Sequence, residues 1–199
     1  SQYITKRAVS MFQPDIDSNR DTLTQEIAGK SVCVIGGAGS IGSSFIKAVV
    51  KFKPASLCVI DLNENGLAEL TRDLRSSADI VVPGDYRTYT LNFADPIFAR
   101  IFRENKGFDI VANFVAESHV DRSIEDPEVF LRTNIIGTEV LMDACLKYGV
   151  NRYHQVSTDE VYGDLPLEAT DLFFTESTPL HTSSPYSASK ASADLLVMA

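Results

Sequence analysis

Short segments rich in apolar and β-branched residues alternate with longer segments of helical periodicity from Ser31 onward, and this alternation limits the possible folds more than any other feature. Strands that alternate with helices along a chain pair in parallel, and the helices cover both faces of the sheet. The sequence therefore predicts an α/β fold built on a doubly wound parallel sheet. The expected strands span residues 31–35, 56–61, 86–92, 108–116 and 152–157, and the expected helices span 43–52, 64–76, 96–104, 127–148 and 186–199.

A glycine-rich turn follows the first expected strand. Gly36, Gly39 and Gly42 stand at three-residue spacing in VIGGAGSIGS, where the strand passes into a helix. Such glycines permit the tight turn, the approach of a pyrophosphate to the backbone, and close packing of helix on strand, in that order. Phosphates then meet the free N–H groups of the helix N-terminus, which includes Ser40 and Ile41. The turn predicts a Rossmann-type dinucleotide site, and the alternative is a turn that holds no ligand.

Two further residues at strand ends are expected to bind the adenosine part of the dinucleotide. Asp61 ends the second strand, 19 positions after Gly42. A carboxylate there accepts hydrogen bonds from the ribose hydroxyls and repels a 2′-phosphate, which favours NAD over NADP. Alternatively, Asp61 only caps the next turn together with Asn63. Asn92, after the third strand, is predicted to reach the adenine.

Tyr186 and Lys190 lie four positions apart, so they share one face of the last helix. A lysine beside a phenol lowers the pKa of the phenol from about 10. A phenol with a pKa nearer neutrality is an acid/base catalyst. This spacing occurs often by chance, but together with the glycine-rich turn it indicates oxidation of an alcohol against a bound nicotinamide.

Composition and charge exclude several classes of partner. The formal net charge of −9 argues against binding to nucleic acid or to an anionic membrane. No apolar run approaches the roughly 18 residues of a membrane-spanning helix. Cys33, Cys58 and Cys145 are scattered among apolar residues, which is typical of buried thiols in a reducing compartment and not of disulfides or a metal site. We therefore expect a cytoplasmic protein without a metal. Residues 1–30 form a polar lead-in with a candidate short helix at 21–26. Residues 1–20 are polar and are broken by Pro14, so we do not expect them to be a signal peptide.

A hydroxyl and two carboxylates, Thr158, Asp159 and Glu160, follow the fifth expected strand. Ligands of an open α/β sheet bind at the carboxyl ends of its strands. These three residues are therefore candidates for the reacting site, and the alternative is an acidic loop in solvent.

Four segments of the second half together resemble the dTDP-glucose 4,6-dehydratase family, which belongs to the extended short-chain dehydrogenases/reductases. They are VAESHVDRSI at 115–124, TNIIGT at 133–138, STDEVYGDL at 157–165 and SPYSASKAS at 184–192. The first half, with its lead-in and VIDLNENG at 59–66, is more similar to the polysaccharide-biosynthesis dehydratases that act on UDP-N-acetylhexosamines. The two halves thus agree on the chemistry and differ on the sugar and the base.

The resemblance implies a redox-neutral lyase reaction on a nucleotide-sugar with NAD as a prosthetic group. In that reaction Tyr186 takes the proton of the C4 hydroxyl while hydride passes to NAD, and Lys190 holds the phenolate and the nicotinamide ribose. Thr158 donates a hydrogen bond to the C4 oxygen. Glu160 then removes the C5 proton and Asp159 protonates the departing C6 hydroxyl, before hydride returns to C6. The product is a 4-keto-6-deoxy sugar.

The resemblance also places Glu117, Ser118 and His119 near the substrate, although His119 is equally compatible with a structural part. It implies a homodimer built from the helices at 127–148 and 186–199. Residues 31–199 would be the NAD-binding domain, truncated before a C-terminal part that binds the nucleotide-sugar, because sheets of this kind have at least one more strand. The alternatives are a UDP-N-acetylhexosamine 4,6-dehydratase, a nucleotide-sugar 4-epimerase or reductase, and an NAD-binding fragment without turnover.

Overall fold

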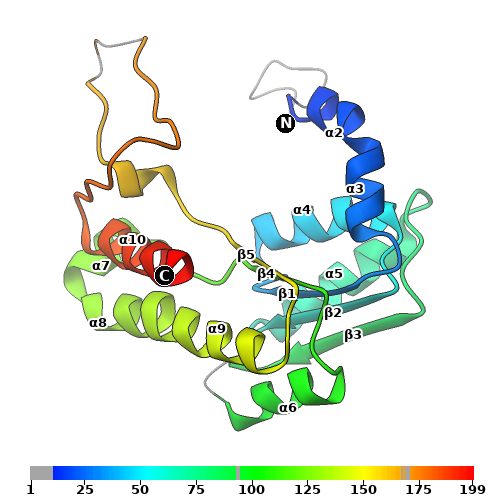
Figure 1. Cartoon of the computed structure of the whole chain (residues 1–199). Coiled ribbons are helices and arrows are strands. Elements are labelled where there is room, and N and C mark those ends of the chain that lie inside the picture. The colour runs from blue at the N-terminus through cyan, green and yellow to red at the C-terminus, as the bar shows by residue number, and fades with distance from the viewer. Residues whose placement is uncertain (1–10, 93–94, 167, 169–170) are drawn as a thin grey trace.

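The computed structural model describes residues 11–92, 95–166, 168 and 171–199 (Figure 1). Within these residues the chain forms one parallel sheet in the order β3–β2–β1–β4–β5, which confirms the predicted α/β fold. The order runs outward from β1 in both directions, so a topological switch point lies between β1 and β4. The strands are β1 (Ser31–Ile35), β2 (Ser56–Asp61), β3 (Asp85–Thr90), β4 (Ile110–Asn113) and β5 (Arg152–Gln155).

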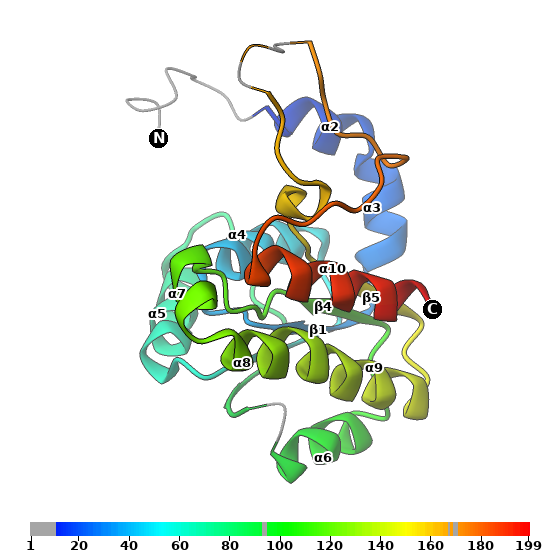
Figure 2. The same ribbon diagram turned by 90° about the vertical axis from the view of Figure 1, so that its left-hand side faces the viewer.

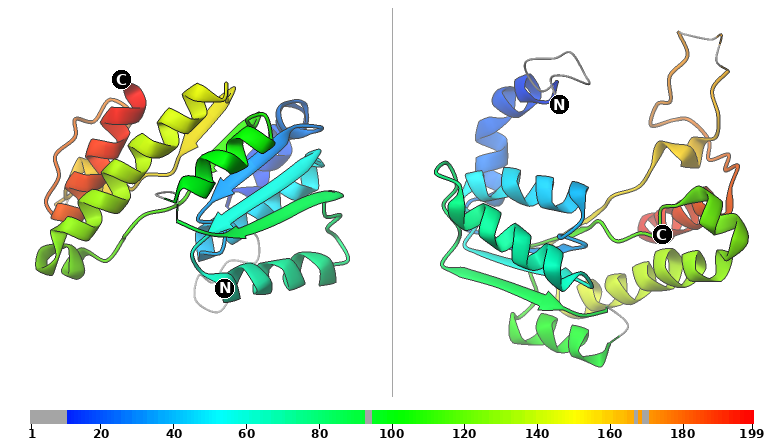
Figure 3. Two further views of the ribbon diagram at one scale, coloured as in Figure 1. Left: turned by 90° about the horizontal axis from the view of Figure 1, so that it is seen from below. Right: turned by 180° about the vertical axis from the view of Figure 1, so that it is seen from behind.

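Helices cover both faces of the sheet, and each face has its own apolar core. Val32 and Val34 of β1 point to one face, where they join Ile46 of α4 and the predicted leucine row of α5. Cys33 and Ile35 point to the other face, toward α6 and α9. In the right-hand view of Figure 3, α4 and α5 lie over one face and α6 lies under the other. These helices are α4 (Ser40–Val49), α5 (Glu64–Ser76), α6 (Pro96–Glu104) and α9 (Gly137–Lys147).

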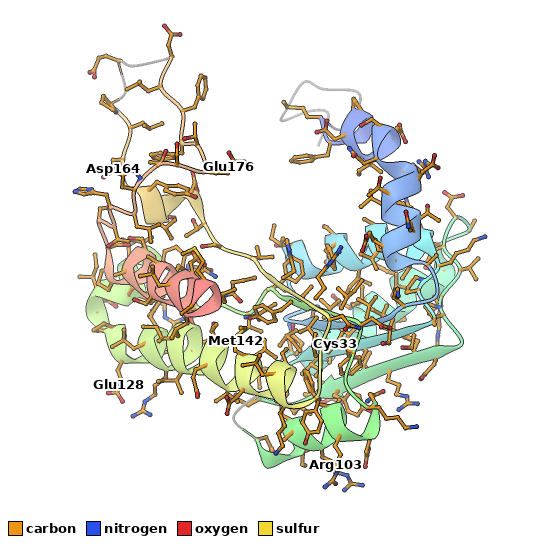
Figure 4. The ribbon with its side chains drawn as sticks, in the orientation of Figure 1. Cys33, Arg103, Glu128, Met142, Asp164 and Glu176 are labelled. Carbon is orange, nitrogen blue, oxygen red and sulfur yellow. The ribbon has the colours of Figure 1, made fainter. Side chains whose placement is uncertain are left out.

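The side chains follow the same division between interior and surface. Cys33 lies within the layers in Figure 4, whereas Arg103 points outward from α6 and Glu128 from α8 (Pro127–Phe130). The thiols of Cys33, Cys58 and Cys145 are all buried and free. No helix in the described part of the chain has the length and apolar character to cross a bilayer.

A helix runs without a break through residues 127–147, close to the expected range of 127–148, but its hydrogen-bonding pattern changes along its length. It consists of α8 (Pro127–Phe130), the π-helical segment η2 (Leu131–Ile136) and α9. A π-helical turn widens the helix and often marks a functional site. Here it contains the buried Asn134. The last helix, α10 (Pro185–Met198), runs alongside it in Figure 2.

Several boundaries differ from those expected. The strands predicted over 108–116 and 152–157 are wrong in length, since β4 and β5 have only four residues each. β4 ends where the side chain of Asn113 turns back to accept from Val115 N–H. The helix α7 (Val120–Glu125) was not expected. In the lead-in, α3 (Arg20–Ile27) covers the expected short helix, and α2 (Gln13–Ser18) precedes it.

Candidate active site

A cavity of about 320 Å³ opens at the carboxyl edge of the sheet, beside the switch point between β1 and β4. Ligands of open α/β sheets bind in this crevice, and cavities of this size suit small molecules. Its walls come from the glycine-rich turn, the end of β2, the residues after β3 and the segment after β4. The lining residues are Ile35, Gly36, Ala38, Gly39, Ile60, Asp61, Leu62, Asn63, Leu91, Asn92, Phe114, Val115, Ala116, Glu117 and Thr133.

The glycine-rich turn is tightly fitted at two of its three expected positions. Gly36 has φ +76°, and a Cβ there would lie 2.9 Å from the backbone nitrogen of Val115. A Cβ on Gly42 would lie 2.3 Å from the carbonyl oxygen of Gly36, so α4 packs directly on the turn. A Cβ on Gly39 would meet nothing closer than 3.6 Å, because this glycine faces the cavity. Gly37 was missed in the sequence, although a Cβ there would lie 2.3 Å from Val59 Cγ1.

The N-terminus of α4 fits an anion. Gly39 is its N-cap residue, and no side chain among the described residues caps it. The first N–H groups of the helix, which include those of Ser40 and Ile41, therefore keep their capacity to donate. Unpaired N–H groups and the positive end of the helix dipole favour a phosphate at this position.

Asp61 joins the glycine-rich turn to the turn after β2. Its Oδ2 accepts from Ala38 N–H at 2.8 Å, and its Oδ1 accepts from Asn63 N–H at 2.9 Å. The turn-capping alternative is therefore present in the structure. Each carboxylate oxygen can accept a second hydrogen bond, so this arrangement leaves capacity for ribose hydroxyls. Asn92 lies in the wall of the same cavity.

The N-terminus of α10 presents Tyr186 and Lys190, both of which are buried. Burial raises the pKa of Tyr186; a hydrogen bond with Thr158 lowers it, and the charges of Glu160 and Asp159 raise it. The net pKa is above its ordinary value, so the expected lowering by Lys190 is wrong for this structure. The reason is the direction of the ammonium group, which donates to the carbonyl oxygen of Val156 at 2.7 Å.

Lys190 is buried, and a neighbouring charge partly offsets the effect of this burial on its pKa. Burial lowers the pKa of its ammonium group, and the charge of Asp194 raises it. Asp194 accepts a 2.5 Å hydrogen bond from Ser157 Oγ. Neither Ser157 nor Asp194 was singled out in the sequence, because their partnership spans 37 positions.

Thr158, Asp159 and Glu160 stand beside the N-terminal part of α10. Asp159 and Glu160 begin the short helix η3 (Asp159–Tyr162), and Thr158 caps it by accepting from Glu160 N–H at 3.3 Å. Both carboxylates are exposed. The helix η3 contacts α10, and the charges of both carboxylates raise the pKa of Tyr186. The structure thus brings together the hydroxyl, the two carboxylates and the phenol that the sequence singled out.

The segment after β4 lies between the cavity and α10. Glu117 lines the cavity, and its backbone is held by Asn134, as described below. Ser118 and His119 are exposed at the start of α7, and His119 provides no side-chain cap for this helix. The cavity lining contains none of the three residues at 158–160, nor Tyr186 or Lys190. The expected site residues therefore form two groups, joined by this segment.

No cluster of metal-binding side chains is found in the residues that the structure describes. The arrangement instead combines a cavity fitted for a dinucleotide phosphate with a buried phenol and two carboxylates at the same sheet edge.

Comparison with known proteins agrees with this arrangement. The dTDP-glucose 4,6-dehydratase of Mycobacterium tuberculosis H37Rv is 44% identical over 168 residues, which are 83% of this chain and 47% of the relative. The dTDP-glucose 4,6-dehydratase 1 of Escherichia coli K12 is 42% identical over 189 residues, which are 84% of this chain and 49% of the relative. The chain thus spans about half the length of these curated relatives.

Solved structures extend the likeness to the fold. The dTDP-glucose 4,6-dehydratase DesIV from Streptomyces venezuelae, solved with NAD and TYD bound, matches with a TM-score of 0.69 and 36% identity over 83% of this chain and 49% of its own. The UDP-Glc/GlcNAc 4-epimerase from Campylobacter jejuni matches with a TM-score of 0.73 and 26% identity over 85% of this chain and 48% of its own. The family model described as GDP-mannose 4,6 dehydratase matches residues 33–199. The chain belongs to this family of nucleotide-sugar dehydratases.

Proposed function

We propose that the protein is an NAD-dependent nucleotide-sugar 4,6-dehydratase that converts dTDP-glucose to dTDP-4-keto-6-deoxyglucose. The observation that carries this proposal is that the short helix η3, which carries Asp159 and Glu160, contacts α10, which carries Tyr186. Oxidation of an alcohol against a bound nicotinamide needs only the phenol among the protein's acid/base groups, whereas loss of water from the neighbouring carbons also needs an acid and a base. Relatives that are 40–44% identical and are named dTDP-glucose 4,6-dehydratase support the same substrate.

The residues around the cavity fit NAD. The open face of Gly39 and the uncapped start of α4 would receive the pyrophosphate, and Asp61 and Asn92 would receive the adenosine. A carboxylate at position 61 disfavours the extra phosphate of NADP. When bound, NAD supplies a reversible hydride acceptor. Similar structures that were solved with NAD bound support this choice of cofactor.

The chain's own groups then manage the protons. Tyr186 Oη takes the proton of the sugar C4 hydroxyl, and Thr158 Oγ1 hydrogen-bonds the C4 oxygen. Burial raises the pKa of the phenol, so the hydrogen bond with Thr158, which lowers this pKa, must favour the phenolate during the reaction. By the resemblance to the dehydratases, Lys190 would hold the nicotinamide ribose. Glu160 removes the C5 proton, and Asp159 gives a proton to the departing C6 hydroxyl. These two roles follow the resemblance to the dehydratases. Glu117, Ser118 and His119 follow β4 and would face the substrate.

An assay for the keto sugar tests the proposal. The protein, incubated with NAD and dTDP-glucose, should form a 4-keto-6-deoxy product that absorbs in alkali and loses one water by mass spectrometry. Product from UDP-N-acetylglucosamine alone would assign the second dehydratase class, which the first half of the chain resembles. Inversion at C4 without loss of water would assign an epimerase. Tight NAD binding without product from any of these sugars would overturn the enzymatic proposal.

The proposal includes a homodimer in a cytoplasmic, reducing environment. Large apolar side chains are exposed along the two helices that the resemblance assigns to the dimer interface, and an isologous dimer would cover them. They are Leu131, Ile136 and Leu146 of η2 and α9, and Leu195, Leu196 and Met198 of α10. Sedimentation equilibrium should give twice the mass of one chain. Substitution of Ile136 and Leu195 by aspartate should yield monomers if these helices form the interface.

We also propose that residues 31–199 correspond to the NAD-binding part of the longer relatives.

A further inference from the structure

The backbone of Tyr186 is held on both sides by buried serine hydroxyls. Ser123 Oγ accepts a hydrogen bond from the N–H group of Tyr186 at 3.1 Å. Ser189 Oγ donates to the carbonyl oxygen of Tyr186 at 2.7 Å. Both serines have a relative exposure of 0%. Hydrogen bonds shielded from water therefore fix the peptide groups that precede and follow the α-carbon of this tyrosine.

The bond from Ser123 completes the capping of α10. The first N–H groups of a helix lack partners within the helix. Pro185 has no N–H group, and Ser184 Oγ accepts from Ser187 N–H at 3.0 Å. The N–H group of Tyr186, which lies between Pro185 and Ser187, donates to the hydroxyl of a serine 63 positions earlier in the chain. The helix is thus capped partly by its own residues and partly by α7.

Both serines also connect Tyr186 to the segment that lines the cavity. Ser123 belongs to α7, which ends this segment. Ser189 Oγ accepts from Asn134 Nδ2 at 2.9 Å. The Asn134 side chain makes two hydrogen bonds with the backbone of Glu117. Its Oδ1 accepts from the N–H group at 2.9 Å, and its Nδ2 donates to the carbonyl oxygen at 3.1 Å. Residues 117–123 are therefore attached to the start of α10 at both ends.

Packing restricts the remaining freedom of the ring. The Phe130 ring meets the Tyr186 ring edge-on, with centroids 6.3 Å apart, and Phe130 is itself 1% exposed. With the backbone fixed on both sides and one side of the ring packed, the direction of the phenol depends on where residues 117–123 hold α10.

We propose that Ser123 is a positioning residue, which sets the place of the Tyr186 phenol relative to the cavity by accepting the hydrogen bond of the tyrosine's backbone N–H group. The Asn134–Ser189 pair is the second attachment of the same support. The kinetic part of this inference rests on the proposed dehydratase function, and the spectroscopic part does not.

Three variants test the kinetic part. Ser123→Ala and Ser189→Ala each remove one attachment, and Ser192→Ala is the matched control, because Ser192 Oγ donates only to Ala188 O of its own helix. Displacement of a reacting group by about 1 Å costs up to about 100-fold in rate. We expect kcat to fall about 10- to 100-fold in the first two variants, with KM within about twofold. Ser123→Thr, which keeps the hydroxyl, should restore kcat to within about threefold of the parent protein. The control should retain the parental kcat.

A titration of the phenol tests the inference without turnover. 3-Fluorotyrosine at position 186 makes the phenol more acidic and gives a ¹⁹F NMR signal that reports its ionisation. Burial raises the pKa of Tyr186, so a ring that has lost its support should be less buried and should titrate at lower pH in Ser123→Ala. Circular dichroism and the melting temperature verify that each variant in the comparison is folded.

Two results would overturn the inference. One is a titration of Ser123→Ala that coincides with that of the parent protein. The other is a kcat that is unchanged in Ser123→Ala, or that falls equally in Ser192→Ala. A parent protein that forms no keto sugar would count against the proposed function alone, because the titration still decides whether Ser123 positions the phenol.

Discussion

The ammonium group of Lys190 donates a hydrogen bond to the carbonyl oxygen of Val156 at 2.7 Å, which fastens α10 to the chain leaving β5. One helical turn later, Asp194 accepts from Ser157 Oγ at 2.5 Å. Two successive residues after β5 are thus held by two side chains on one face of α10. Because Thr158 follows directly, these contacts also fix the start of the segment that carries Thr158, Asp159 and Glu160.

Removal of the charge at position 194 should change the pH dependence of activity. Burial lowers the pKa of Lys190 and Asp194 raises it, so Asp194→Asn should lower this pKa further. A lysine that must stay charged loses its function as the pH rises through its pKa. The alkaline limb of kcat should therefore move to lower pH in Asp194→Asn. Asp194→Ala also loses the hydrogen bond with Ser157, and its kcat at pH 7 should fall about tenfold.

Asp143→Asn is the control for this prediction, because it removes an exposed carboxylate from the neighbouring helix α9. Its pH profile should match that of the parent protein. A profile of Asp194→Asn that also matches would show that Asp194 does not support the charge of Lys190.

Glu160→Gln should abolish dehydration while it leaves the fold and NAD binding intact. The side chain of Glu160 is exposed, so its isosteric replacement removes little packing. A general base contributes about 10²- to 10⁴-fold to a rate, and kcat should fall by that factor. Product formation, NAD affinity by calorimetry and the melting temperature measure the three quantities. Glu176→Gln, in the exposed part of the loop before α10, is the matched control. Unfolding of Glu160→Gln would contradict its assignment as a base.

The sequence predicted those parts of the fold that local chemistry determines. The leucines of α5 and the apolar residues of α6 recur at helical spacing, and both helices were placed at their observed bounds. α7 has only six residues, too few to show a periodicity. The widened winding around Asn134 leaves no signal in the pattern of apolar residues.

The site was predictable only to the level of which residues take part. Asp61 and residues 158–160 were predicted because they follow strands, and ligands bind at the carboxyl edge of a parallel sheet. A spacing of four placed Tyr186 and Lys190 on one helix face but did not give the direction of the ammonium group, which points to Val156. The partner of Tyr186 N–H lies 63 positions away, and no local pattern predicts a contact at that distance.

Alanine at three glycines should separate folding from cofactor binding. A Cβ on Gly42 would lie 2.3 Å from a backbone oxygen that cannot move freely, so Gly42→Ala should destabilise the protein by about 1–3 kcal/mol and weaken NAD binding. Gly39→Ala meets only an ordinary contact at 3.6 Å, so it should fold normally and lose NAD affinity alone. Gly84→Ala has nothing within 4 Å and is the control. Normal NAD affinity in Gly39→Ala would place the pyrophosphate elsewhere.

Stability at acid pH should depend on Asp109, which joins the start of β1 to the start of β4. Its Oδ2 accepts from both the N–H group and the hydroxyl of Ser31 at 2.8 Å, and these bonds lower the pKa of Asp109. A carboxyl whose pKa is lowered by folding gives its full stabilisation at a pH above 3.8, which is its ordinary pKa. This stabilisation is lost as the pH falls through the lowered pKa. Asp109→Asn should therefore reduce the free energy of unfolding by about 1 kcal/mol at pH 7, which is the size of one hydrogen bond, and by clearly less at the lowest pH at which the protein stays folded. Urea denaturation across this range measures the difference. Asp79→Asn, which changes an exposed aspartate in the loop between α5 and β3, should show no such dependence. An equal loss for Asp109→Asn at every pH would show that its ionisation does not stabilise the sheet.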